Sequence, residues 1–306
     1  MNALLSLKDG RLLQWADNGV QSDRAIVLHH GTTISLDVWR TWMRFGAERN
    51  VRIIAINRPG IDQSTRKKGR NIYSDIDDLN ELLEEEGITR FVAIGWSGGG
   101  ARALGSGLLK SCVAIHTVAS IARFEDRVPE SFRGLTEEQI ERNRGFQGNY
   151  EKMFDFRKVT YEEDLALTYE QVLEMLSTLP QYKKFETEYR EFSRDFKDSI
   201  YNVCKNGPEI DADDIYANAN PWGFDIDEIK QPVTLWHGIQ DDGVVIGRSE
   251  YLAGRLANAT LHALPDQDHV SIVVEYREQI LSAAIQDLQR LNTELSATKK
   301  DWGRLI

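Results

Sequence analysis

Short apolar runs alternate with segments of helical periodicity through the first 120 residues. The runs are rich in Val, Ile and Leu, which is typical of buried β-strands. Between two of them, apolar residues recur at three- and four-residue spacing over residues 74–86, which predicts an amphipathic helix. The predicted strands are residues 11–16, 25–28, 51–56, 91–94 and 112–118. This alternation predicts an α/β fold, with a mainly parallel sheet flanked by helices.

The hydrophobic pattern changes between residues 121 and 229. This stretch is charged, carries aromatic residues throughout and contains no strand-like apolar run. One apolar stripe at helical spacing predicts a helix packed on another surface, with the members Leu165, Tyr169, Val172, Leu173 and Leu176. We therefore expect residues 121–229 to form a helical insertion.

Strand character returns after residue 230. Apolar runs at 232–236 and 259–264 each lead into a loop with acidic residues, and a final helix is predicted over about 271–291, before a polar tail. The chain is thus expected to divide into a first part of an α/β core (1–120), a helical insertion (121–229) and a second part of the core (230–306).

Composition excludes several kinds of partner. The chain has 306 residues and a net charge of −11, from 37 basic and 48 acidic residues, so it lacks the cations that replace phosphate counterions on nucleic acids. The same charge disfavours anionic membrane surfaces, and no apolar run reaches membrane-spanning length. The two cysteines build neither a disulfide framework nor a zinc site. The N-terminal residues lack the pattern of a signal peptide, so we expect a cytoplasmic location.

The most informative motif is Gly-Trp-Ser-Gly-Gly at residues 95–99. It follows the apolar run 91–94 and precedes the small-residue segment 100–105, which continues as a helix. In a G-x-S-x-G motif between strand and helix, the serine stands at the tip of a strained turn and its small neighbours let the two elements pack closely. Ser97 is therefore the candidate nucleophile.

A serine hydroxyl needs a base to accept its proton, and the base needs an acid to orient it. In chain order these should be serine, acid and histidine, each after a strand. His269 follows the last predicted strand in a loop and is the predicted base. Asp241 is the predicted acid because residues 238–240 form the turn that delivers it, and Asp242 is the alternative.

An acyl-transfer site also needs N–H groups that stabilise an oxyanion. One donor is expected from the residue after the nucleophile, Gly98, and the other from an early loop. The His-Gly-Thr sequence at 30–32 follows the apolar run 25–28, so the N–H of Thr32 is the predicted second donor.

These motifs resemble those of the α/β-hydrolase superfamily over nearly the whole chain. The resemblance implies an oxyanion loop at 30–32, a nucleophile elbow at 95–99, acid and base loops at 238–241 and 268–269, and a helical cap at 121–229. The loop 57–64 resembles the one after the fourth strand, with Asp62 in place of its second glycine, and Ala101 stands where a proline is common. Members with an aspartate nucleophile, such as dehalogenases and epoxide hydrolases, are disfavoured because Ser97 holds that position.

We therefore expect a serine hydrolase that cleaves a small, apolar ester-type molecule through an acyl-enzyme, without cofactor or metal. The same triad also serves thioester, amide and carbon–carbon bond hydrolysis and perhydrolysis. From another class of function, a small-molecule sensor would use the pocket with slow or no turnover, and residues 287–306 would contact its protein partner.

Overall fold

The computed structural model describes the backbone of residues 2–125 and 128–302, and the side chains of this range up to residue 290. Its centre is an eight-stranded sheet in the order β1-β2-β4-β3-β5-β6-β7-β8. β2 is antiparallel to its neighbours β1 and β4, and the other neighbouring pairs are parallel. The strands are β1 (Asn2–Ser6), β2 (Leu12–Asp17), β3 (Arg24–His29), β4 (Arg52–Ile56), β5 (Arg90–Trp96), β6 (Cys112–Val118), β7 (Val233–Gly238) and β8 (Ala259–Leu264). This confirms the predicted α/β class and its mainly parallel sheet.

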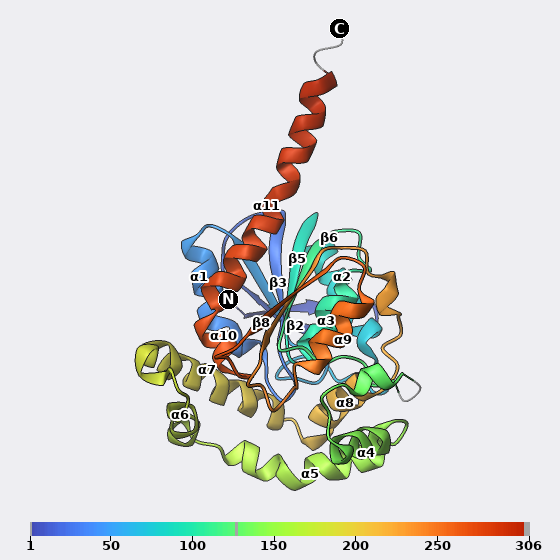
Figure 1. Cartoon of the computed structure of the whole chain (residues 1–306), viewed down its shortest axis with the longest axis vertical. Helices are drawn as coiled ribbons and strands as arrows, with labels where there is room; N and C mark the ends of the chain where they lie inside the picture. Colours follow the sequence, from blue (N-terminus) through green and yellow to red (C-terminus); the bar gives the residue numbers. More distant parts are fainter. Residues whose placement is uncertain (1, 126–127, 303–306) are drawn as a thin grey trace.

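Helices cover both faces of the sheet (Figure 1). On one face lie α1 (Arg40–Glu48), α10 (Ser271–Glu275) and α11 (Arg277–Trp302), and on the other lie α2 (Ile72–Glu85), α3 (Gly99–Ser106) and α9 (Gly247–Arg255). Short 3₁₀ helices occur at η1 (Leu36–Trp39), η2 (Pro129–Phe132), η3 (Tyr182–Lys184) and η4 (Ile226–Glu228). Among the residues that the structure describes, no helix is both long and apolar enough to cross a lipid bilayer.

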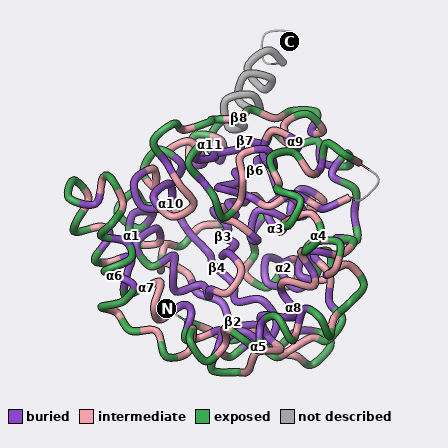
Figure 2. Tube along the Cα trace, turned by 60° about the horizontal axis from the view of Figure 1, so that its bottom comes forward, coloured by how far each residue is buried: buried purple, intermediate pink, exposed green. Residues whose placement is uncertain are grey.

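The central strands are buried on both sides because their residues alternate between two cores. In β3, Ile26 and Leu28 join the core that contains Trp39 from η1, whereas Ala25 and Val27 point into the opposite core, beneath α2 and α3. Figure 2 shows these strands as purple, buried segments in the middle of the molecule, with exposed segments around the rim. A continuous apolar run in the sequence was therefore the correct signal for these strands.

Among the described residues, five α-helices lie between β6 and β7, where the sequence predicted a helical insertion: α4 (Glu137–Phe146), α5 (Tyr150–Ala166), α6 (Tyr169–Ser177), α7 (Glu186–Cys204) and α8 (Pro208–Ala219). They gather at one end of the molecule (Figure 1). The prediction of a single helix through Leu165 and Leu176 was wrong. α5 ends at Ala166, and Thr168 starts α6 with a capping box, in which its side chain accepts from the N–H of Gln171.

Two helix ends also differ from the sequence-based expectation. α2 begins at Ile72, before residue 74, because Asn71 caps it and exchanges bonds with Ser74. The final helix breaks at Tyr276, between α10 and α11, and then runs to Trp302 rather than ending near 291. No glycine or proline interrupts residues 277–302, and good helix formers dominate there. Of the segment proposed as a partner contact, residues 303–306 and the side chains from 291 onwards lie outside the described residues.

Candidate active site

Ser97 lies in the turn between β5 and α3 with φ 54, in the left-handed region that non-glycine residues seldom occupy. Its N–H donates to the carbonyl of Val118, at 2.9 Å, which fixes the turn against β6. A Cβ on Gly95 would overlap the carbonyl of Gly99, and one on Gly99 would overlap the carbonyl of His29. The glycines of the motif are thus needed because the backbones of β3, β5 and α3 meet there.

The loops after β7 and β8 bring Asp241 and His269 together. The Nδ1 atom of His269 lies 2.7 Å from Oδ2 of Asp241, a hydrogen bond that leaves Nε2 for other partners. The indole N–H of Trp96 donates to the carbonyl of His269, at 3.0 Å, so the residue before Ser97 also fixes the histidine loop. Asp242, the alternative acid, is exposed.

The Asp241 carboxylate is buried and surrounded by donors. Its Oδ1 accepts from the N–H of Val244 at 2.7 Å, and its Oδ2 lies 3.5 Å from Nε2 of His237. Burial alone would raise the pKa of Asp241, but the bonds from His237 and His269 outweigh it and lower the pKa to about 2. The carboxylate therefore stays charged at neutral pH and can stabilise a protonated His269.

His237 supports the acid loop, a role that the sequence did not reveal. Its Nδ1 lies 2.6 Å from the hydroxyl of Ser249 and its Nε2 lies 2.7 Å from the carbonyl of Val244. The signal was present only as a histidine at the end of a strand, four residues before the predicted acid. His116 is held differently, between Asp287 and the indole of Trp236, as expected for a core histidine.

Ser97 and His269 line one cavity of about 300 Å³, together with Thr32. Trp96 and Phe196 contribute to its apolar wall. Phe192 of the insertion packs against Trp96, with ring centroids 6.2 Å apart. This volume is at the lower end of the range for small-molecule sites.

The two predicted oxyanion loops lie side by side. A Cβ on Gly98 would overlap the side chain of Thr32 and would come 3.4 Å from its backbone nitrogen. The amide of Asn218, from α8, donates to the Thr32 hydroxyl at 2.9 Å. Arg102 donates to the carbonyl of Gly98 at 3.0 Å and also to Oδ1 of Asn218. One buried arginine thus links both loops to α8.

Comparison with known proteins places this arrangement in a family. A family model described as alpha/beta hydrolase fold matches residues 24–276. The chain belongs to the α/β hydrolase fold family. That range includes the strands from β3 to β8 and each of the loops described above.

The similarity to individual proteins covers a short stretch or has low sequence identity. The bifunctional esterase/perhydrolase of Acinetobacter calcoaceticus is 31% identical over 97 residues, which cover 31% of this chain and 35% of that protein. The aligned stretch thus spans about a third of the relative. Two solved structures share the fold at low identity. One is an esterase from Exiguobacterium antarcticum, which is 15% identical with a TM-score of 0.65. The other is the enol-lactonase from Burkholderia xenovorans, which is 16% identical with a TM-score of 0.65. Each alignment covers 94% of this chain and 100% of the other chain.

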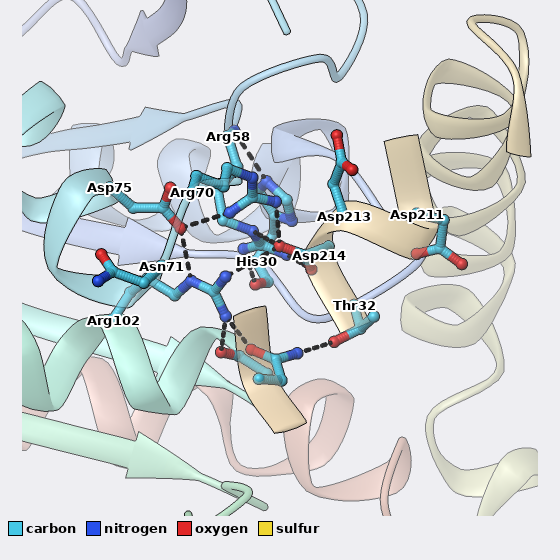
Figure 3. A network of polar contacts seen from close by, with 12 residues as sticks. His30, Thr32, Arg58, Arg70, Asn71, Asp75, Arg102, Asp211, Asp213 and Asp214 are labelled. Carbon is cyan, nitrogen blue, oxygen red and sulfur yellow. Dashed lines mark hydrogen bonds and ion pairs between the residues drawn. The ribbon is translucent and has the colours of Figure 1, made fainter. Parts of the chain in front are cut away.

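This α/β hydrolase also contains a buried ion cluster beside the predicted oxyanion loop of His30 and Thr32 (Figure 3). Arg58, Arg70 and Arg102 converge on Asp214 of α8, and Arg70 and Arg102 share Asp75 of α2. All five side chains are at most 1% exposed. The cluster joins α8 to the core of the fold at several points.

Arg58 connects this cluster to the predicted oxyanion loop. Its guanidinium donates to the carbonyl of His30 at 2.6 Å and to that of Gly31 at 2.7 Å. Burial, and then the charge of Arg58, hold the pKa of His30 well below its usual range, so the imidazole is neutral. The loop before Thr32 is therefore fixed by charge-assisted bonds to its backbone.

Asp62, which replaces a glycine of the family pattern, fits the loop after β4. Its φ is 49, so it adopts the left-handed conformation for which glycine is usually chosen. Its carboxylate accepts from the amide of Gln14 at 2.7 Å and from Lys205, the residue that follows α7. Aspartate tolerates this conformation better than most residues, and these partners hold it.

Proposed function

We propose that this α/β hydrolase is a serine hydrolase that cleaves carboxylic esters through an acyl-enzyme. The observation that carries the proposal is the 2.7 Å bond between His269 and Asp241, beside a strained Ser97 that opens into the same cavity as His269. The family and its esterase-like relatives support a hydrolase. Residues 121–229 would serve as the cap over the substrate.

In this proposal Ser97 Oγ attacks the ester carbonyl and gives its proton to Nε2 of His269. The N–H groups of Gly98 and Thr32 stabilise the oxyanion, and Asp241 stabilises the imidazolium. Collapse of the tetrahedral intermediate breaks the ester C–O bond, and His269 protonates the departing alcohol. Water then attacks the acyl-enzyme, with His269 as the base, and releases the acid and Ser97.

Labelling with a fluorophosphonate probe tests this proposal directly. The probe should modify Ser97, as located by mass spectrometry, and turnover of a phenyl ester should stop in proportion. Labelling at another residue, or full turnover by the labelled enzyme, would contradict it. Labelling of Ser97 without multiple turnovers of any ester would favour the sensor function.

Replacing Asp241 by asparagine should lower kcat about 10⁴-fold, because the amide favours the wrong tautomer of His269 and cannot stabilise its charge. Asp242→Asn, one residue away and exposed, is the matched control and should keep the wild-type kcat. Steady-state kinetics on one phenyl ester compare the two variants. The reverse ranking would make Asp242 the acid.

Asn218 is proposed as a positioning residue for the oxyanion loop. Asn218→Ala removes the bond to the Thr32 hydroxyl and leaves the Arg102 guanidinium with one partner fewer. We expect kcat to fall about tenfold with a small change in KM, since a displaced donor weakens transition-state binding more than substrate binding. A higher KM at constant kcat would instead assign Asn218 to substrate binding.

Perhydrolysis is the second candidate activity, because the Acinetobacter relative carries that name as well as esterase. Hydrogen peroxide would then replace water in the attack on the acyl-enzyme and release a peracid. An assay of peracid formation with a short-chain ester and peroxide tests this. Ester hydrolysis without peracid formation would leave the esterase activity alone.

A further inference from the structure

A second cavity, of about 370 Å³, adjoins the cavity of Ser97. Thr32 lines both cavities, so they meet at the proposed oxyanion loop. The second cavity is lined by residues of α4, α5 and α8 and by the loop after β7. A substrate whose carbonyl sits at Ser97 can therefore extend one of its two ends into this space.

The charge in the second cavity is opposite to that of the chain. Arg142 and Arg248 line it, and no aspartate or glutamate does so among the described residues. The chain as a whole has a net charge of −11. Two guanidinium groups that line one cavity, with no carboxylate of a described residue on its wall, make it attractive to an anion.

Arg248 is buried, at 7% exposure, and no carboxylate of a described residue forms an ion pair with it. Its terminal nitrogens donate to the backbone carbonyls of Ala122 and Ser131, and the guanidinium carries more N–H groups than these bonds use. Burial lowers the pKa of Arg248 to about 10, so the group stays charged at neutral pH. A buried charge with neutral partners gains from an anionic ligand.

The cavity of Ser97 provides the contrast. It also contains an arginine, Arg157, but Asp164 lies 2.6 Å from that guanidinium, and Asp211 contacts it as well. Its charge is therefore neutralised within the protein. In the second cavity, by contrast, the partners of Arg248 among the described residues are backbone carbonyls.

Arg142 lies on α4 and faces this cavity beside the amides of Gln139 and Asn143. It is exposed, and no carboxylate of a described residue pairs with it. The remaining wall is largely apolar, with Phe124, Phe146 and Phe156. A short hydrocarbon chain that ends in a carboxylate matches this combination of apolar wall and guanidinium groups.

We propose that this cavity binds a carboxylate on the substrate, so that the preferred esters carry a free acid group at the end of a short chain. This inference rests on the proposed esterase function and names its substrate class. Arg248 and Arg142 would hold the carboxylate, while Ser97 attacks the ester carbonyl.

The test compares two esters of matched length, 4-nitrophenyl hydrogen glutarate and 4-nitrophenyl valerate, in which a methyl group replaces the acid. We expect the wild type to prefer the glutarate in kcat/KM. Arg142→Ala should reduce the glutarate-to-valerate ratio of kcat/KM about tenfold or more, because a charged hydrogen bond to the carboxylate is lost. Arg142→Glu should reduce this ratio further, because its negative charge repels the carboxylate. The matched control, Arg190→Ala, removes an exposed arginine of α7 and should keep the wild-type ratio.

A wild type that prefers valerate, or a ratio that Arg142→Glu leaves unchanged, would overturn the proposal. Calorimetric binding of monophenyl glutarate and phenyl valerate to Ser97→Ala separates this inference from the esterase function. Tighter binding of the glutarate that Arg142→Glu abolishes would support the anion site even if neither ester is hydrolysed. Equal binding of both compounds would contradict the site even if both esters are hydrolysed.

Discussion

Ser97→Ala is expected to lower kcat for a phenyl ester about 10⁶-fold, the size of loss seen when a triad nucleophile is removed. The substitution removes only the hydroxyl group, and alanine must adopt the same left-handed conformation, φ 54, as serine does. The oxyanion donors and the cavity remain, so residual turnover should come from them alone. Steady-state and single-turnover kinetics measure the loss.

The same variant should unfold at the wild-type temperature, because the backbone bond from residue 97 to Val118 is kept. Ser177→Ala, on the exposed side of α6, is the control for loss of a serine hydroxyl and should keep full activity. Activity within tenfold of the wild type in Ser97→Ala would refute the triad.

Asp214→Asn should destabilise the fold by about 3–5 kcal/mol, the usual result of removing one partner from a buried ion pair. The substitution keeps the shape of the side chain but removes the carboxylate that pairs with Arg58, and it leaves Arg70 and Arg102 to share Asp75. Urea denaturation followed by circular dichroism measures the change in the free energy of unfolding.

The exposed pair between Asp227 and Arg255 provides the control. Asp227→Asn should cost about 1 kcal/mol or less, since solvent screens this pair. Losses of similar size in the two variants would mean that burial of the cluster adds nothing.

The cluster also predicts a pH dependence. Burial on its own would raise the pKa of Asp214, but the charges of Arg58, Arg102 and Arg70 hold it well below its usual range. The contribution of Asp214 to stability should therefore be fully present above the pKa of an unfolded aspartate, about 4, and be lost only as the pH falls toward the lower folded value. Asp214→Asn should abolish this part of the acid dependence.

The sequence predicted the fold where local pattern decides it. The buried strands were visible as apolar runs because both of their faces are covered, and residues 95–99 required a strand, a turn and a helix in that order. β1 was not predicted, since it lies at the sheet edge with no buried residue. A single helix through 165–176 was wrongly predicted because the apolar stripe continues across Thr168, although the side chain of Thr168 caps the start of a new helix there.

The candidate active site could be predicted only where its residues follow predicted strands in the order serine, acid and histidine. The pattern could not separate Asp241 from Asp242, since both fit the turn, whereas the structure places Asp241 beside His269 and leaves Asp242 in solvent. The catalytic roles of these residues stay predictions. Pairs such as Arg102 and Asp214 were beyond sequence reasoning, because a charged residue in a helix is usually solvated and its partner is more than a hundred residues away.

The anchoring of α8 bears on which part of the helical segment would admit a substrate to Ser97 in the proposed function. Lifting α8 from the sheet would separate Asp214 from three buried arginines, which makes such a motion costly. α4 and α5 bury three side chains, Phe146, Met153 and Arg157, fewer than α8 does, and moving them would break the ion pair of Arg157 with Asp211 but leave the Asp214 cluster intact. We therefore expect α8 to stay fixed on the core while α4 and α5 move to open the site.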